Sequence, residues 1–223
     1  MTDPGLKDRL TRVRERIHSA AARCGRDPAG ILLLAVTKVF PAAAILDGYE
    51  LGLRDFGENY VQEFAEKAPG LGGLEGTRYH LIGHLQSNKS AKAAELFEVI
   101  QTVDSAKLAT RLNALGKPIE VMLEVKLSPE ASKTGADAAE ICALADAVRA
   151  CSNLRLTGLM TVPPWSENAE LSRPYFAQLR GLAERLKLPQ LSMGMSNDLE
   201  VAIEEGSTCV RIGTALFGKR KKA

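Results

Sequence analysis

The chain has 223 residues, of which 45% are hydrophobic and 25% are charged, a composition typical of one large globular domain. Its formal net charge is +2, and the basic residues among 219–223 contribute +4, so the rest of the chain carries −2. This balance excludes a nucleic-acid-binding surface, and the lack of any apolar stretch near ~18 residues excludes a membrane-spanning helix.

The first predicted element is a helix within residues 1–27. Apolar residues recur at helical spacing along one face, opposite a face of Arg and Lys: Leu6, Leu10, Val13, Ile17 and Cys24. Gly25 stands in the C′ position that commonly ends a helix, and Pro28 follows it. We expect an extra N-terminal helix packed on the domain that follows. The first five residues lack a signal-peptide pattern, so we expect a cytoplasmic protein.

Eight short runs with the character of strands follow, at 31–37, 53–56, 79–83, 98–102, 119–125, 154–160, 190–194 and 208–212. Several are apolar at successive positions, as a parallel strand covered on both faces requires. The segments between them have helical periodicity. Strand and helix alternating eight times predict an α/β fold, a (β/α)8 TIM barrel. We expect residues 1–223 to form this single domain, with 219–223 as a solvated basic tail.

Lys38 follows the first predicted strand directly. Lysine is seldom buried, and a desolvated lysine loses pKa until its neutral amine can attack a carbonyl group. The alternative is a lysine that extends its ammonium group into water. Because the active sites of such barrels lie at the carboxyl ends of the strands, the position of Lys38 favours an amine in a site.

The end of the eighth predicted strand has the features of a phosphate-binding segment. Gly213 permits close backbone approach, and Thr214 begins a short helical segment with free amides. The loop after the seventh strand faces it and offers the hydroxyl group of Ser196. Two alternatives remain: Gly213 only makes a tight turn, or Ser196-Asn197 begins a helix in which Glu200 completes a capping box.

Arg211 is predicted to point into the barrel. Val210 and Ile212 face the helices by strand alternation, so Arg211 faces inward, where an unpartnered guanidinium costs several kcal/mol. Its partner is an interior carboxylate, with Glu120 and Glu124 as candidates, or a ligand atom. A lysine amine, a phosphate cup and an inward arginine together match the needs of pyridoxal 5′-phosphate (PLP).

The cysteines and histidines predict no metal site. Four cysteines show no C-x-x-C spacing, which suits reduced thiols better than a disulfide framework or a zinc site. The one close histidine pair, His80 and His84, straddles Gly83 at the end of a predicted strand, an arrangement that does not favour metal binding.

Seven motifs occur in order along residues 7–218: AVTK at 35–38, FGENYVQE at 56–63, YHLIGHLQSNK at 79–89, KTG at 133–135, GLMT at 158–161, SMGMSND at 192–198 and VRIGTALFG at 210–218. With these motifs the chain resembles the pyridoxal phosphate homeostasis proteins, the YggS/PROSC family. The resemblance implies an alanine-racemase-like barrel of the fold type III PLP-binding class. It also implies a role in intracellular PLP homeostasis and amino-acid balance, without established turnover.

The resemblance also implies the roles of individual residues. Lys38 would hold PLP as an internal aldimine, and Ser196, Gly213 and Thr214 would hold the phosphate. Arg211 would face the ring nitrogen. Asn59 would lie beside the cofactor; from the residues alone it could instead cap a helix with Gln62 at the third position.

Two functions remain open, and the first is favoured. A PLP carrier or regulator would release the cofactor to other proteins, with PLP-dependent apo-enzymes as recipients. A slow fold type III racemase or decarboxylase would use Lys38 as its base. An arginine donates a hydrogen bond only to an unprotonated ring nitrogen, and it therefore weakens PLP as an electron sink. The sequence also continues for only five residues after Gly218, so we expect no second domain that would supply another base. A Schiff-base aldolase without PLP would not need the inward Arg211. We expect a monomer.

Overall fold

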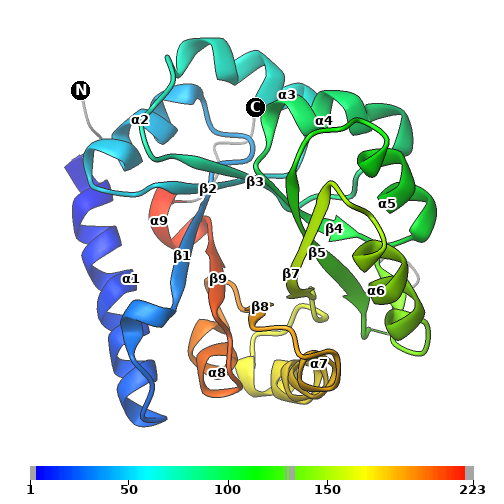
Figure 1. Ribbon diagram of the computed structural model, residues 1–223. Coiled ribbons are helices and arrows are strands. Elements are labelled where there is room, and N and C mark those ends of the chain that lie inside the picture. The colour runs from blue at the N-terminus through cyan, green and yellow to red at the C-terminus, as the bar shows by residue number, and fades with distance from the viewer. Residues whose placement is uncertain (1–3, 129, 131–133, 219–223) are drawn as a thin grey trace.

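Parallel strands close into a barrel surrounded by helices (Figure 1), as the sequence predicts. The computed structural model describes residues 4–128, 130 and 134–218. Its strands are β1 (Leu32–Val36), β2 (Asp55–Glu58), β3 (Arg78–Leu81), β4 (Val99–Val103), β5 (Ile119–Lys126), β6 (Ala136–Asp137), β7 (Leu154–Met160), β8 (Gln190–Ser192) and β9 (Cys209–Ile212). Their order is β4-β3-β2-β1-β9-β8-β7-β5-β6, and β4 also pairs with β5, which closes the barrel and leaves β6 outside.

The helices follow the strands as a (β/α)8 fold requires. They are α1 (Pro4–Arg23), α2 (Ala42–Glu50), α3 (Val61–Lys67), α4 (Ser90–Leu96), α5 (Ala106–Asn113), α6 (Ile141–Arg149), α7 (Arg173–Leu186), α8 (Leu199–Glu204) and α9 (Thr214–Phe217). Apolar side chains fill the layer between strands and helices, including Val210 and Ile212 of β9. Polar side chains occupy part of the barrel interior, among them His80, Gln101 and Arg211, which are all buried.

Two strands differ from the predicted ones. The second was expected at 53–56 and lies at Asp55–Glu58. Leu53 instead completes the turn after α2, where its amide donates to the carbonyl oxygen of Gly48 and Gly52 has a φ of 86°. The two-residue β6, which pairs with the end of β5 outside the barrel, was not predicted.

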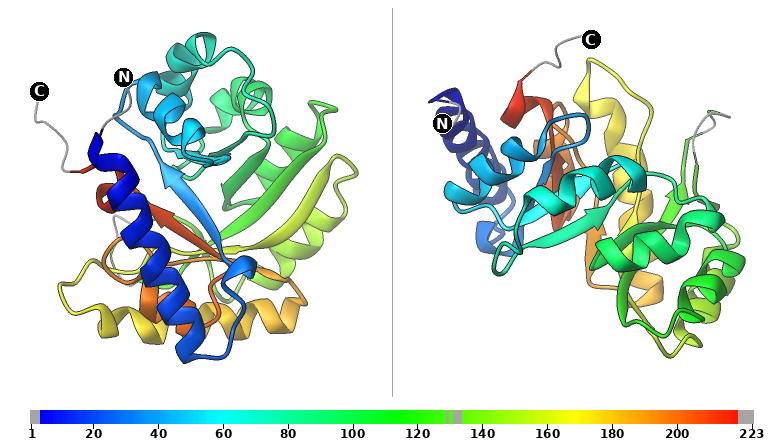
Figure 2. Two further views of the ribbon diagram at one scale, coloured as in Figure 1. Left: turned by 90° about the vertical axis from the view of Figure 1, so that its left-hand side faces the viewer. Right: turned by 90° about the horizontal axis from the view of Figure 1, so that it is seen from above.

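The N-terminal helix α1 packs along α8 and α9, on the outside of the barrel (left view of Figure 2). The predicted face is buried at Leu6, Leu10, Val13 and Ile17. Gly25 has a φ of 69°, the left-handed conformation expected of a C′ glycine. Cys24 was expected on the apolar face and is exposed, because the helix ends at Arg23 and the chain turns away there.

Candidate functional site

The six predicted site residues share one side of the barrel mouth. Lys38 follows β1, Asn59 follows β2, and Ser196 lies in the loop after β8. The other three lie at the end of β9: Arg211, Gly213 and Thr214. Strands β2, β1, β9 and β8 are consecutive neighbours in the barrel, so the fold brings these residues to adjacent positions. The carboxyl ends of these four strands therefore form the candidate site.

The backbone around Lys38 is held in an unusual conformation. Thr37 is fully buried, and its amide donates to the carbonyl oxygen of Gly57 at 3.0 Å. Val39 has a φ of 60°, which is rare for a β-branched residue. Its amide donates to Glu63 Oε1 of α3 at 2.5 Å. Such strain persists only where the surroundings impose it, and it is common at functional sites.

A buried ammonium group, that of Lys67 at the end of α3, lies beside this turn. The side chain of Lys67 is only 9% exposed. Its Nζ lies 3.0 Å from Thr37 O, 2.9 Å from Glu58 Oε1 and 2.5 Å from Glu63 Oε1. Three acceptors match the three donors of an ammonium group. Lys67 therefore connects α3 and the end of β2 to the residues on both sides of Lys38.

Glu58, at the end of β2, is fully buried within this network. Thr37 Oγ1 donates to its Oε1 at 2.8 Å, and its Oε2 has no hydrogen-bond partner among the described residues. Burial raises the pKa of Glu58, and the hydrogen bond and charge of Lys67 oppose this rise. Glu58, Glu63 and Lys67 were not predicted from the sequence, although the i, i+4 spacing of the last two indicated a pair.

The predicted phosphate-binding segments meet at Ser196. Its Oγ accepts a hydrogen bond from the amide of Ala215, in the first turn of α9, at 3.2 Å. Gly213 has a φ of −110°, and a Cβ there would lie 3.5 Å from Val36, which is ordinary contact. Neither strain nor crowding within the protein therefore requires a glycine at this position.

The alternative that Ser196-Asn197 begins a helix is wrong. Helix α8 begins at Leu199 with Asp198 as its N-cap residue. Asp198 accepts hydrogen bonds from the amide of Met195 and from Ser172 Oγ, which fix the loop. The side chain of Asn197 instead donates to Ser166 O in the loop after β7, at 2.9 Å.

Arg211 points into the barrel as predicted and is 4% exposed. Its Nη1 donates to Ser192 Oγ and its Nη2 to Thr161 O, each at 2.8 Å. The prediction of a carboxylate partner is therefore only partly met. Glu124 acts on Arg211 through its charge, whereas Glu120 forms ion pairs with Arg78 of β3 and Arg155 of β7, near the amino-terminal ends of the strands.

A chain of hydrogen bonds, not predicted from the sequence, extends from Arg211 across the barrel interior. Ser192 Oγ donates to Gln101 Oε1 at 2.6 Å, Gln101 Nε2 lies 3.0 Å from His80 Nδ1, and His80 Nε2 lies 2.9 Å from Asp55 Oδ1. This chain of hydrogen bonds begins at the guanidinium group of Arg211 on β9 and ends at the carboxylate group of Asp55 on β2. Polar residues within otherwise apolar strands were the signal for it.

Asn59 and Glu124 at the mouth each have a buried oxygen atom that forms no hydrogen bond within the part of the chain that the structure describes. Asn59 is not a helix cap, because α3 begins at Val61 and its N-cap residue is Tyr60. Asn59 Oδ1 and Glu124 Oε2 have no hydrogen-bond partner among the described residues, and both side chains line a cavity of about 180 Å³. Burial raises the pKa of Glu124, while the hydrogen bond from Thr134 opposes the rise. Unpaired buried polar atoms are costly, so they indicate room for a ligand group here.

Comparison with known proteins agrees with this geometry. The family described as alanine racemase, N-terminal domain, matches residues 9–221. The pyridoxal phosphate homeostasis protein of Pseudomonas aeruginosa is 47% identical, with 96% of both chains covered. That of Escherichia coli K12 is 46% identical, with 95% of both covered. The chain belongs to the pyridoxal phosphate homeostasis protein family.

Solved structures of relatives confirm the fold. The structure of PipY from Synechococcus elongatus with PLP bound is 39% identical, with a TM-score of 0.82, and covers 92% of this chain and 100% of that one. An alanine racemase of Clostridium difficile has a TM-score of 0.69 at 14% identity, and 98% of this chain corresponds to 56% of that chain. The second likeness shows the fold alone. The predicted alanine-racemase-like barrel is thus confirmed.

Within the described residues, no cluster of His, Cys, Asp and Glu could hold a metal ion. No helix in residues 4–128, 130 and 134–218 is long and apolar enough to cross a membrane. The thiol groups are all free cysteines. The KTG motif begins at Lys133, and the basic tail occupies 219–223; both positions lie outside the described residues.

Proposed function

We propose that this chain binds PLP through the amine of Lys38 and takes part in intracellular PLP homeostasis. The observation that carries the proposal is the gathering of an amine, the two predicted phosphate-binding segments at Ser196 and at Gly213 and Thr214 (the cup), and an inward arginine on four neighbouring strands. The PLP-bound structure of the related PipY supports it. Bound PLP supplies an aldehyde that condenses with an amine, and Lys38 is the amine at the mouth.

Different residues recognise different parts of PLP. Ser196, Gly213 and Thr214 receive the phosphate group, with the hydroxyl groups of Ser196 and Thr214 and the backbone amides at the start of α9, before Ala215, as donors. Arg211 faces the pyridine nitrogen, to which a guanidinium can only donate. Asn59 would lie beside the ring, and its Oδ1 is a buried oxygen atom that has no partner among the described residues.

The fixed position of Arg211 affects whether the protein could process amino acids. Its guanidinium group is fixed by Ser192 and Thr161 in the barrel interior, and arginine keeps its charge under all ordinary conditions. A permanent cation at the ring nitrogen disfavours protonation of that nitrogen, which weakens PLP as an electron sink. This feature favours a protein that holds PLP over one that processes amino acids.

The visible absorption spectrum of the purified protein tests the proposal. We expect a band of lysine-bound PLP that survives dialysis and is lost in Lys38→Ala. Lys89→Ala is the matched control, because Lys89 lines the neighbouring groove beside Asn59 and has no proposed cofactor contact. A wild-type protein that stays colourless after incubation with PLP would overturn the proposal.

The proposal extends to release of PLP to PLP-dependent apo-enzymes. The loaded protein, freed of excess PLP, is mixed with a purified apo-enzyme, and the regained enzyme activity is measured against an equal amount of free PLP. We expect activity to return while the absorption band of the carrier declines. A band that persists while the apo-enzyme remains inactive would contradict this part of the proposal.

Exchange of the α-proton separates the carrier from a slow racemase. Amino acids are incubated with the loaded protein in deuterated water, and incorporation at the α-carbon is followed by NMR. We expect no incorporation above that of free PLP. Incorporation that depends on Lys38 would favour the enzyme instead.

A further inference from the structure

Helix α1 carries three arginines at intervals of seven residues, Arg9, Arg16 and Arg23. Seven residues make almost two helical turns, so the three side chains leave the helix on the same side. Each of them contacts the C-terminal third of the chain. Anchoring α1 does not require this, since its apolar face is already buried. The arginine row therefore calls for a separate explanation.

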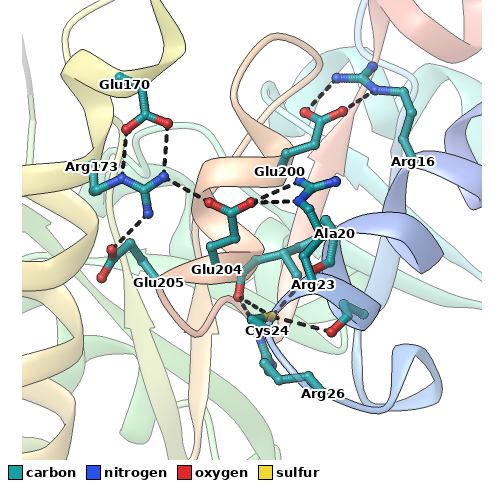
Figure 3. A network of polar contacts seen from close by, with 12 residues as sticks. Arg16, Ala20, Arg23, Cys24, Arg26, Glu170, Arg173, Glu200, Glu204 and Glu205 are labelled. Carbon is teal, nitrogen blue, oxygen red and sulfur yellow. Dashed lines mark hydrogen bonds and ion pairs between the residues drawn. The ribbon is translucent and has the colours of Figure 1, made fainter.

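Arg16 holds the loop that carries Ser196. Its Nε and Nη2 donate to the two oxygens of Glu200 at 2.6 and 2.9 Å, and Nη2 also donates to Ser196 O at 3.0 Å. Figure 3 shows the paired contacts between Arg16 and Glu200. Such bidentate, charge-assisted contacts fix geometry as well as adding energy. Burial opposes ionisation of Glu200, but the hydrogen bonds and charge of Arg16 hold its pKa below the ordinary value.

Arg9 holds the second segment of the cup. Its Nε donates to the carbonyl oxygen of Leu216, within α9. This helix directly follows Gly213 and begins with Thr214. Because Ser196 Oγ accepts from the amide of Ala215, the two segments are also joined to each other. Arg9 and Arg16, two turns apart on one helix, thus contact both sides of the cup.

Arg23 makes the same kind of contact at a different place. It donates from Nε and Nη2 to Glu204 Oε1, at 3.1 and 2.8 Å, at the end of α8 (Figure 3). Glu204 also pairs with Arg173, which in turn pairs with Glu170 and Glu205 (Figure 3). Arg23 therefore ties α1 to α8 without contacting either segment of the cup. It provides a matched control on the same helix.

We infer that Arg16, assisted by Arg9, is a positioning residue for the phosphate group of the ligand. It acts through the main chain of Ser196 and through α8, and it does not touch the ligand. This inference rests on the proposed function. It gives the extra N-terminal helix a specific role: α1 sets the spacing between the loop after β8 and the start of α9.

The test compares PLP with pyridoxal, which has the same ring and aldehyde and lacks the phosphate group. Dissociation constants for both are measured by absorption titration on the full chain, for the wild type, Arg16→Met and Arg23→Met. Methionine keeps most of the apolar stem of arginine. We expect Arg16→Met to weaken PLP binding roughly tenfold, the usual scale for loss of a supporting hydrogen-bond partner, and to leave pyridoxal binding unchanged. Arg23→Met should change neither.

A merely structural role would give a different result. An equal loss of affinity for both compounds, or unchanged PLP binding in Arg16→Met, would overturn the inference. If Arg16→Met does not fold, Arg16→Lys keeps the charge but not the bidentate contact, and the same selective loss of PLP affinity is expected. If the wild type binds neither compound, both the proposed function and this inference are overturned. If the wild type binds PLP but Arg16→Met shows no selective loss of PLP affinity, only the inference is overturned.

Discussion

Lys67 donates a hydrogen bond from its buried Nζ to the carbonyl oxygen of Thr37, the residue directly before Lys38, at 3.0 Å. On the other side of Lys38, the amide of Val39 donates to Glu63, which also pairs with Lys67. One ammonium group thus stabilises the backbone on both sides of the proposed PLP-binding lysine. Val39, with its unusual φ of 60°, lies within this arrangement.

Lys67→Met should destabilise the protein strongly, because it leaves two carboxylates without their cation. Removing one partner of a buried ion pair costs about 3–5 kcal/mol. Lys92→Met is the control, since the pair of Lys92 with Glu95 is exposed and is expected to contribute less than about 1 kcal/mol. Free energies of unfolding in urea, measured without PLP, provide the comparison. Equal and small effects of the two substitutions would contradict the network described here.

The hydrogen-bond chain behind Arg211 predicts the tautomer of His80. Arg211 can only donate, so Ser192 Oγ accepts from it and donates to Gln101. The amide nitrogen of Gln101 then faces His80 Nδ1, which must accept. In the neutral ring the proton therefore lies on Nε2 and is donated to Asp55.

Nitrogen-15 NMR of the imidazole rings measures this directly. The chain has only three histidines, and His18 and His84 are exposed, so a His80→Gln variant assigns the buried ring. We expect the long-range correlations of an Nε2–H tautomer. A proton on Nδ1 would show that the chain of donors does not run from Arg211 to Asp55.

Glu124→Gln should stabilise the protein increasingly as the pH rises. Burial raises the folded-state pKa of Glu124 above its ordinary value of 4.5. The stability contributed by this group is therefore fully present below the unfolded value and is lost as the pH rises through the folded value. Glutamine keeps the acceptor for Thr134 and removes the charge. The free energy of unfolding in urea is measured for both proteins at about pH 4 and about pH 7, and the difference in favour of the variant should be larger at the higher pH. A difference that becomes smaller as the pH rises would contradict this assignment.

The sequence predicted the barrel well because buried parallel strands are continuous apolar runs. The strand at 53–56 was misplaced because Leu53 is apolar and buried but belongs to the turn after α2. β6 was missed because it has two residues and pairs outside the barrel. The first error arises because burial alone does not distinguish a strand from a turn.

The site was predictable where a residue type is unusual for its position, as with Lys38 and Arg211. Arg16 and Lys67 were not found, because a basic residue on the polar face of an amphipathic helix is usually solvated. Only the tertiary fold shows that Ser196 O and Thr37 O lie opposite these side chains. Supporting residues of this kind leave little trace in a single sequence.

Lys38 is the proposed attachment point of PLP. Reduction of the PLP-loaded protein with borohydride makes a covalent attachment permanent, and proteolysis with mass spectrometry then locates it. We predict a phosphopyridoxyl group on the peptide that contains Lys38, and none on that peptide when the protein is reduced without PLP. Modification only at other lysines, or no modification of a protein that binds PLP, would contradict the account.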